Sequence, residues 1–193
     1  MVKLNKIYTR TGDDGTTGLV DGSRIAKSAP LMAAIGDVDE ANSAIGIAAA
    51  ALPADGDAAA MLVRIQNEMF DLGADLATPA DPEAGFGPHD MALRIVPAQI
   101  ARLEDEIDRM NDGLDALKSF ILPGGTDAAA RLHLARAVTR RAERAAVAAG
   151  ADRDLNPLAL TYLNRLSDHL FVLTRHLNAA AGGDVLWKPG ATR

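Results

Sequence analysis

The sequence predicts an all-α protein, a five-helix bundle with an irregular N-terminal arm. Hydrophobic residues make up 48% of the 193 residues but aromatic residues only 4%, and alanine, the strongest helix former, supplies much of the difference. Four stretches place apolar residues at helical spacing on one face, and a further helix is predicted from its N-cap and its end at Gly150. We expect one domain over 1–193, with the arm at 1–30, the bundle at 31–181 and a tail at 182–193.

The arm is predicted from turn-forming residues. Segments 11–18 and 21–23 are rich in Gly, Asp, Ser and Thr and have no helical period. The first helix should cover about 31–52, because Ile35, Val38 and Ile45 share one apolar face. A second, polar side of this helix carries Asp39, which is either a surface acid or the partner of an arginine elsewhere.

The second and third helices follow from apolar residues and proline positions. The second carries an apolar stripe and should end at Thr78 and Pro79. Its stripe consists of Leu62, Ile65, Met69, Leu72 and Leu76. The third should begin at Pro97, because proline suits a first helical position, and should stop before Gly113.

The last two helices have recognisable starts. The segment 120–127 consists of an apolar stretch, a Pro-Gly-Gly turn and an N-cap for a fourth helix that runs to Gly150. Asn156 and Pro157 supply a cap and a first-turn proline for the fifth helix. The fifth helix carries a leucine seam formed by Leu163, Leu166, Leu170, Leu173 and Leu177.

Composition excludes several classes of function. With 20 basic and 26 acidic side chains the net charge is -6, so the overall field repels nucleic acid. The chain has no cysteine, which excludes disulfides, thiolate metal sites and cysteine nucleophiles. No signal peptide is recognisable, and no apolar stretch could span a bilayer. We therefore expect a cytoplasmic protein that binds neither nucleic acid nor membranes.

The predicted fourth helix concentrates positive charge. Between residues 131 and 144 it has five arginines and one acid, Glu143. Arg136, Arg140 and Arg144 are four residues apart, so like charges lie along one stripe, which a carboxylate or a bound polyanion would relieve. Arginine matches phosphate in shape and charge, so a triphosphate is one candidate ligand. The alternative is a solvated, salt-bridged face, which the stripe alone favours because surface charge runs are common.

Segment 9–18 offers hydroxyls, an arginine and backbone amides beside glycines, which also suits phosphate. Neither a Walker A motif nor a G-x-G-x-x-G motif is present, and an ordinary glycine-rich turn is the alternative. The four histidines form no H-E-x-x-H motif, and no G-x-S-x-G motif exists. The sequence therefore predicts no protein-bound metal, and it offers no standard nucleophile. One face of the fifth helix, distinct from the leucine seam, carries Asn164, Asp168, Phe171 and Arg175, which could meet a ligand or another helix.

Five sequence blocks occur together in this chain. They are KIYTRTGD at 6–13, GDVDE at 36–40, FILPGG at 120–125, RRAER at 140–144 and NRLSD at 164–168. In this order, and over nearly the whole chain, the blocks resemble those of the PduO-type ATP:cob(I)alamin adenosyltransferases. The resemblance implies transfer of the 5'-deoxyadenosyl group of ATP to the cobalt of cob(I)alamin, with adenosylcobalamin and triphosphate as products. It also implies a homotrimer of five-helix bundles with active sites between adjacent subunits.

The resemblance further implies a set of binding residues. The arm becomes a nucleotide-binding arm, and Mg2+ accompanies the triphosphate without an assigned protein ligand. The residues implied to hold ATP are Thr9, Arg10, Thr11, Gly12, Thr17 and Lys27 from the arm and Arg140, Arg141, Ala142, Glu143, Arg144 and Asn164 from the bundle.

Four residues are implied to act in the reaction. Arg136 would pair with Asp39 and reach the nucleotide, Arg140 would hold the triphosphate, and Phe120 would cover the lower face of the corrin and exclude its axial base. Cellular flavoproteins would then reduce the cobalt, and a B12-dependent enzyme would receive the product. Trp187 is the one candidate in the short tail for a further aromatic contact to the corrin.

A non-catalytic helical module that binds ATP or a corrinoid for regulation or delivery is the alternative function. Its arginine stripe would look the same. The Phe120 block together with a complete nucleotide set disfavours it, because a sensor has no need to control the lower face of cobalt.

Overall fold

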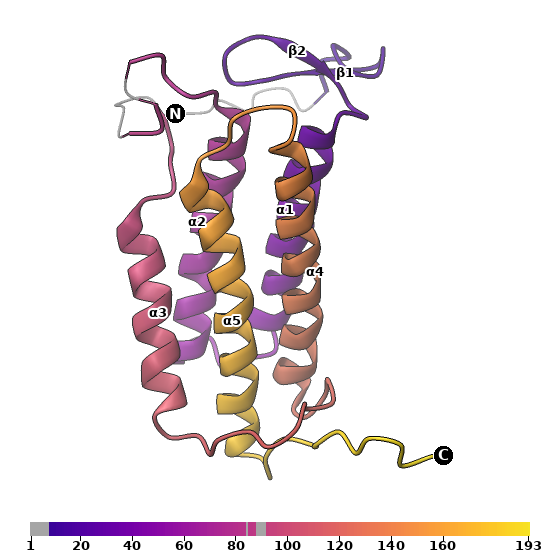
Figure 1. Ribbon diagram of the computed structural model, residues 1–193, viewed down its shortest axis with the longest axis vertical. Coiled ribbons are helices and arrows are strands. Elements are labelled where there is room, and N and C mark those ends of the chain that lie inside the picture. The colour runs from indigo at the N-terminus through magenta and orange to yellow at the C-terminus, as the bar shows by residue number, and fades with distance from the viewer. Residues whose placement is uncertain (1–7, 84, 88–91) are drawn as a thin grey trace.

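The computed structural model describes residues 8–83, 85–87 and 92–193. The described residues form five helices that run side by side along the long axis of the molecule (Figure 1). They are α1 (Pro30–Ala49), α2 (Asp57–Ala77), α3 (Pro97–Asn111), α4 (Asp127–Ala149) and α5 (Pro157–Ala179). The predicted five-helix bundle is confirmed. No helix among these residues is long and apolar enough to cross a membrane.

The helix boundaries agree with the capping signals. The hydroxyl of Thr126 accepts a hydrogen bond from the Ala129 amide at 3.2 Å at the start of α4. The side chain of Asn156 caps α5 in the same way. The first helix ends at Ala49 rather than at residue 52, because Pro53 follows and proline disfavours helical geometry in the residue before it.

The contact between α1 and α4 is the most extensive in the bundle, and alanine makes it close. Each helix has alanines at steps of seven that are at most 1% exposed. Small side chains let two helix axes approach, so larger residues at these positions would push α1 and α4 apart. The six alanines of this seam are Ala34, Ala41 and Ala48 on α1 and Ala135, Ala142 and Ala149 on α4.

A buried carboxylate joins three elements at one end of the bundle. Asp75 in α2 accepts hydrogen bonds from Arg94, from the Ile95 amide and from Asn156 at 2.7–2.8 Å. The side chains of Asp75 and Arg94 are 0% and 4% exposed, so each neutralises a charge that would be costly if buried alone. This network fixes the end of α2 against the start of α3 and of α5.

The arm is more regular than the sequence predicts. It contains an antiparallel ribbon of β1 (Thr16–Gly18) and β2 (Arg24–Ala26), in which Thr17 is opposite Ile25. The ribbon lies at the end of the bundle where α1 begins and α4 ends (Figure 1). Strands of three residues separated by turn formers carry too short an apolar pattern to be recognised in the sequence.

Candidate active site

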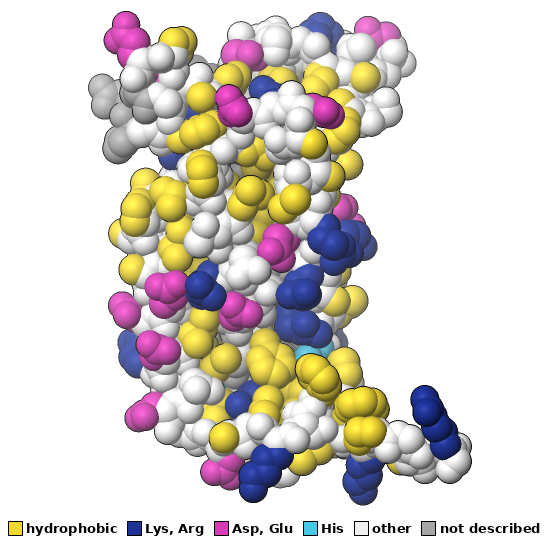
Figure 2. Space-filling view, in the orientation of Figure 1, with side chains coloured by type: hydrophobic (Ala, Val, Ile, Leu, Met, Phe, Trp, Pro, Cys, Tyr) yellow, Lys and Arg dark blue, Asp and Glu magenta, His cyan; other side chains and the backbone are white. Residues whose placement is uncertain are grey.

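One face of α4 is lined by basic side chains. Successive residues of a helix are rotated by about 100°, so residues at steps of three and four lie on one side. His133, Arg136, Arg140 and Arg144 therefore form one stripe. No carboxylate among the described residues pairs with these three arginines. Figure 2 shows Lys and Arg side chains gathered over α4, above a group of hydrophobic side chains near the tail.

The RRAER block distributes its side chains over different surfaces. Arg141 turns toward α1 and forms ion pairs with Glu40 and Asp37. Ala142 is fully buried in the alanine seam, so its side chain cannot reach a ligand. Glu143 accepts a hydrogen bond from Asn164 of α5 at 2.9 Å. The remaining two residues, Arg140 and Arg144, are exposed and point outward from α4.

The charge on the stripe is poorly compensated within the chain. Burial, and next the neighbouring Arg140, lower the pKa of Arg136, and its Nε is buried without a hydrogen-bond partner. Burial and then the charge of Arg136 lower the pKa of His133 below its ordinary value of 6.5, against the opposing effect of Asp184. His133 is 3% exposed, and neither ring nitrogen has a hydrogen-bond partner among the described residues. An anion against this face would stabilise the positive charge.

In the arm, loop 9–15 is folded back onto the ribbon. The Lys27 ammonium donates to the Gly12 carbonyl at 2.8 Å, and a side chain at Gly12 would crowd the Lys27 Nζ at 3.1 Å. The hydroxyls of Thr9 and Thr11 are 2.9 Å apart, and Arg10 has a backbone φ of 63°, which few non-glycine residues adopt. Hydroxyls, a lysine and a strained loop thus gather within a few residues of each other.

Arg24 braces the same loop. It donates from Nη2 to the Thr11 carbonyl at 2.5 Å and from Nε to the Thr16 hydroxyl at 2.9 Å. Thr16 in turn donates to Asp14, and these bonds lower the pKa of Asp14. Arg24 was not predicted to be a site residue, and only its position in a strand opposite the loop could have indicated this role.

An aromatic surface lies at the opposite end of α4. The ring of Phe120 is 78% exposed, and the ring of Trp187 lies 6.1 Å from it at an angle of 53°. Their segments pair as antiparallel chains, because the Trp187 amide donates to the Phe120 carbonyl and the Leu122 amide to the Val185 carbonyl, both at 2.8 Å. We call this paired surface, Phe120 with Trp187, the aromatic platform. Large exposed aromatic groups of this kind mark a binding surface.

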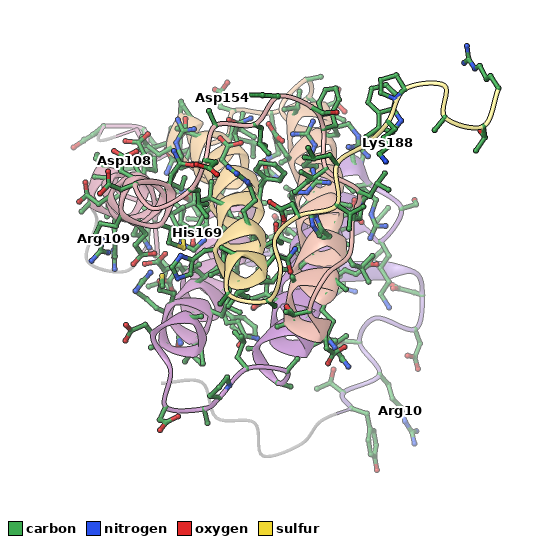
Figure 3. All side chains as sticks on the ribbon, turned by 90° about the horizontal axis from the view of Figure 1, so that it is seen from below. Arg10, Asp108, Arg109, Asp154, His169 and Lys188 are labelled. Carbon is green, nitrogen blue, oxygen red and sulfur yellow. The ribbon has the colours of Figure 1, made fainter. Side chains whose placement is uncertain are left out.

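The rest of the tail does not cover the aromatic platform. Viewed from below, the segment that carries Lys188 runs past α4 and away from the bundle, while His169 lies among the helices (Figure 3). Asp184, at the start of the tail, binds Arg175 and Asn178 of α5. The sequence placed Arg175 on a face that could meet a ligand or another helix, whereas the structure places it against Asp184 of the tail and the loop carbonyl of Asp115.

Several residues that the resemblance assigns to one active site lie far from each other within a single chain. The arm lies at one end of the bundle and the Phe120 segment at the other (Figure 1), separated by α4, which is about 34 Å long. Asp39 lies in a groove between α1 and α2 with the exposed ring of Phe70, and Arg136 of α4 is not among the residues that line this groove. Neither side chain has a hydrogen bond or ion pair within the part of the chain that the structure describes.

Comparisons with known proteins agree on one family. Residues 7–177 match the family described as cobalamin adenosyltransferase. The corrinoid adenosyltransferase of Mycobacterium tuberculosis is 52% identical over 194 residues, which cover 100% of this chain and 97% of that protein. The corrinoid adenosyltransferase of Bacillus subtilis is 42% identical over 190 residues, or 96% of this chain and 94% of that protein.

The chain belongs to the cobalamin adenosyltransferase family. Solved structures in this family have the same fold. A phenylalanine-to-alanine variant of the PduO-type ATP:corrinoid adenosyltransferase from Lactobacillus reuteri, complexed with cobalamin and ATP, superposes with a TM-score of 0.84 at 38% identity. The superposition covers 95% of this chain and 99% of that one. The resemblance inferred from the five sequence blocks is confirmed.

As a member of the cobalamin adenosyltransferase family, the chain brings part of the predicted site together. Arg136, Arg140 and Arg144 share a face, and the arm residues Thr9 to Gly12 lie with Lys27. The Lys6 and Ile7 positions of the first block, like His89, lie outside the described residues. No group of three or more acidic or histidine side chains that could hold a metal occurs among the residues that are described.

Proposed function

We propose that this chain transfers the 5'-deoxyadenosyl group of ATP to the cobalt of cob(I)alamin and releases triphosphate. The observation that carries the proposal is the stripe of Arg136, Arg140 and Arg144, which pairs with no carboxylate of the described residues and lies on the helix that begins beside the aromatic platform. Three guanidinium groups suit a triphosphate, and a broad aromatic surface suits a corrin ring. Membership of the cobalamin adenosyltransferase family supports both assignments.

The nucleotide would lie between the stripe and an arm. Arg140 and Arg144 would bind the triphosphate, and Thr9, Arg10, Thr11, Gly12, Thr17 and Lys27 would close over it. Mg2+ would enter with the triphosphate and keep most of its ligands as water. Arg141 and Ala142 would support the site rather than touch ATP with their side chains, since one binds α1 and the other fills the alanine seam. Glu143 and Asn164 would bind ATP as a hydrogen-bonded pair.

The chemical step needs no nucleophile from the protein. The electron pair of cob(I)alamin forms the bond from cobalt to the 5' carbon, which oxidises cobalt to the +3 state. The bond from the 5' carbon to the triphosphate oxygen breaks, and the triphosphate leaves with that electron pair. The protein therefore supplies orientation and positive charge where the leaving group develops, which is consistent with the absence of a standard catalytic motif.

Phe120 would prepare the metal. Against the lower corrin face its ring would displace the axial base, and cobalt without that donor is easier to reduce. Trp187 extends the same surface, which supports its assignment as a second corrin contact. Reduction would come from a flavoprotein, and a B12-dependent enzyme would take the product.

We further propose that the working form is a homotrimer with its sites between subunits. Asp39 and Arg136 have no partner among the described residues and do not meet within one chain, so their pairing would join two copies. The ATP site would then lie at the interface between two copies, where the arm and the arginine stripe meet and Asp39 of the neighbouring copy pairs with Arg136. The chain would function as one domain over 1–193 in the cytoplasm, where ATP and reduced cobalamin are available.

The direct test is product formation. The purified protein receives ATP, Mg2+ and chemically reduced cobalamin without oxygen, and the absorbance spectrum is followed before and after exposure to light. We expect the light-sensitive spectrum of adenosylcobalamin, which should not form when ATP is omitted. Binding of both substrates without product would instead favour a non-catalytic carrier and overturn the proposal.

A further inference from the structure

The aromatic platform is attached to α5 through one carboxylate. Each oxygen of Asp184 accepts one hydrogen bond at 3.1 Å, Oδ2 from Nε of Arg175 and Oδ1 from Nδ2 of Asn178. Arg175 and Asn178 are 8% and 3% exposed, and the Asp184 side chain is 11% exposed. A charged pair with so little solvent around it holds its geometry more firmly than a surface ion pair. We call these three residues the clamp.

The clamp also holds the chain on the other side of the platform. Asn178 accepts a hydrogen bond from the Thr126 amide at 3.1 Å and donates to the Gly124 carbonyl at 3.2 Å. Gly125, between them, has a φ of 103°, and a Cβ there would lie 2.1 Å from Asn178 Oδ1. The turn that follows Phe120 is thus fitted closely around the Asn178 side chain.

A third segment and the start of α4 meet the clamp as well. Arg175 donates to the Asp115 carbonyl at 2.7 Å, which fixes the loop that leads into the Phe120 segment. Asn178 binds the amide of Thr126, which is the N-cap of α4, the helix that carries the stripe. The clamp therefore lies at the junction of the aromatic platform and the basic face of α4.

The segments that the clamp holds contribute little to the core. Every residue of the tail from 182 to 193 except Asp184 is exposed, and Phe120 and Leu122 are exposed too. The apolar core lies along the helices instead. A buried clamp that orders an exposed surface serves that surface more than it serves the stability of the bundle.

We propose that Asp184, held by Arg175 and Asn178, is a positioning residue that sets the platform of Phe120 and Trp187 relative to the arginine stripe. The clamp would fix how far the corrin stands from the bound nucleotide and whether the ring of Phe120 reaches the lower face of cobalt. This inference rests on the proposed function, in particular on the role of Phe120. Small displacements of a reacting group are costly, so loosening the platform should reduce activity without removing any ligand contact.

The test compares Asp184→Ala with Phe120→Ala and with a control, Glu104→Ala. Glu104 pairs with Arg165 at 2.9 Å on the surface between α3 and α5, away from the platform. Each protein is given ATP and cob(II)alamin, and the fraction of four-coordinate cob(II)alamin is measured by magnetic circular dichroism or electron paramagnetic resonance. Turnover from cob(II)alamin with a reductant is compared with turnover from preformed cob(I)alamin, and circular dichroism reports the fold and Tm.

For Asp184→Ala we expect the four-coordinate fraction to fall about tenfold, with a smaller loss of turnover from cob(I)alamin and a fold that remains helical. The control should match the unmodified protein. The positioning role of Asp184 is refuted if Phe120→Ala loses the four-coordinate fraction while a folded Asp184→Ala protein keeps it. If both variants keep the fraction, the proposed role of Phe120 is refuted instead, and with it the basis of this inference.

A milder variant covers the case in which Asp184→Ala does not fold. Arg175→Lys keeps the charge, but a lysine cannot donate to Asp184 and to the Asp115 carbonyl with the fixed fork of an arginine. We expect a partial loss of the four-coordinate fraction with little change in Tm. An unchanged fraction in this variant contradicts the inference.

Discussion

The outward position of Arg140 gives the sharpest test of the basic stripe. Arg140→Ala should weaken the contact with the triphosphate, and Arg131→Ala is the matched control from the same helix. The two arginines are nine residues apart, which corresponds to about 180° of rotation and about 14 Å along α4. Arg131 already pairs with Asp127 at 2.9 Å, whereas no acid pairs with Arg140 among the described residues.

The expected magnitude follows from the missing charge-assisted hydrogen bonds. A hydrogen bond to a charged group contributes about 1.5–3 kcal/mol, which corresponds to a loss of about 10-fold to 150-fold in kcat/KM for ATP. Arg131→Ala should stay within about twofold of the unmodified protein, because it loses only an exposed ion pair. Alanine is the strongest helix former, so neither change should unfold α4.

The assay is the initial rate of adenosylcobalamin formation from preformed cob(I)alamin, measured without oxygen at a series of ATP concentrations. Circular dichroism should show the same helix content in both variants. Equal losses in the two variants would refute the assignment of the stripe to the triphosphate. A loss confined to Arg131→Ala would refute it as well.

Three further predictions follow from the unpaired groups and the tight turn. If Asp39 of one subunit pairs with Arg136 of another, Asp39→Ala and Arg136→Ala chains should each be inactive alone. Co-expressed with different tags and purified as mixed oligomers, they should regain adenosyltransferase activity, because one interface in the oligomer then keeps both residues. Mixed oligomers without activity would contradict pairing across copies. Gly125→Ala should lower Tm by several degrees in a thermal melt, because the new Cβ would collide with Oδ1 of Asn178 in α5 and the φ of this residue is positive. An unchanged Tm would show that the turn has room for a Cβ. The pKa of His133 is depressed below 6.5 when folded, so the unfolded chain gains the proton first, and the stability due to the neutral ring is lost as the pH falls from about 6.5 through the folded pKa. Urea unfolding between pH 5 and 7 should therefore depend less on pH in His133→Gln, with Arg136 and Asp184 unchanged; an identical dependence in the variant would exclude this origin.

The helices were predictable because local signals decide them. Steps of three and four in apolar residues, together with the caps at Thr126 and Asn156, determined type and extent without knowledge of tertiary contacts. The end of α1 was misplaced by three residues because an alanine-rich stretch has high helix propensity on both sides of the true boundary. The arm ribbon was missed because its stability comes from cross-strand bonds such as those of Arg24, which no local pattern indicates.

The site was predictable in part for the same reason. The spacing of Arg136, Arg140 and Arg144 places them on one face of any helix, so their shared face followed from the sequence. The contact of Phe120 with Trp187 joins residues 67 positions apart through a pairing of irregular segments, and the sequence offered only Trp187 as an isolated candidate. The separation of Asp39 from Arg136 within one chain depends on how α1 packs on α2 and α4, which required the fold.

The RRAER block makes the length of α4 a functional property. Its five consecutive side chains face α1, the core, α5 and solvent. The direction of each side chain depends on the number of helical residues that precede it. Inserting or deleting a single residue upstream in the helix would rotate everything beyond it by about 100°. Arg144 would then leave the stripe and Ala142 would leave the seam, although no residue of the block had changed. A substitution in α4 removes one contact at a time. An insertion or deletion of one residue would disrupt the arginine stripe and the alanine seam together.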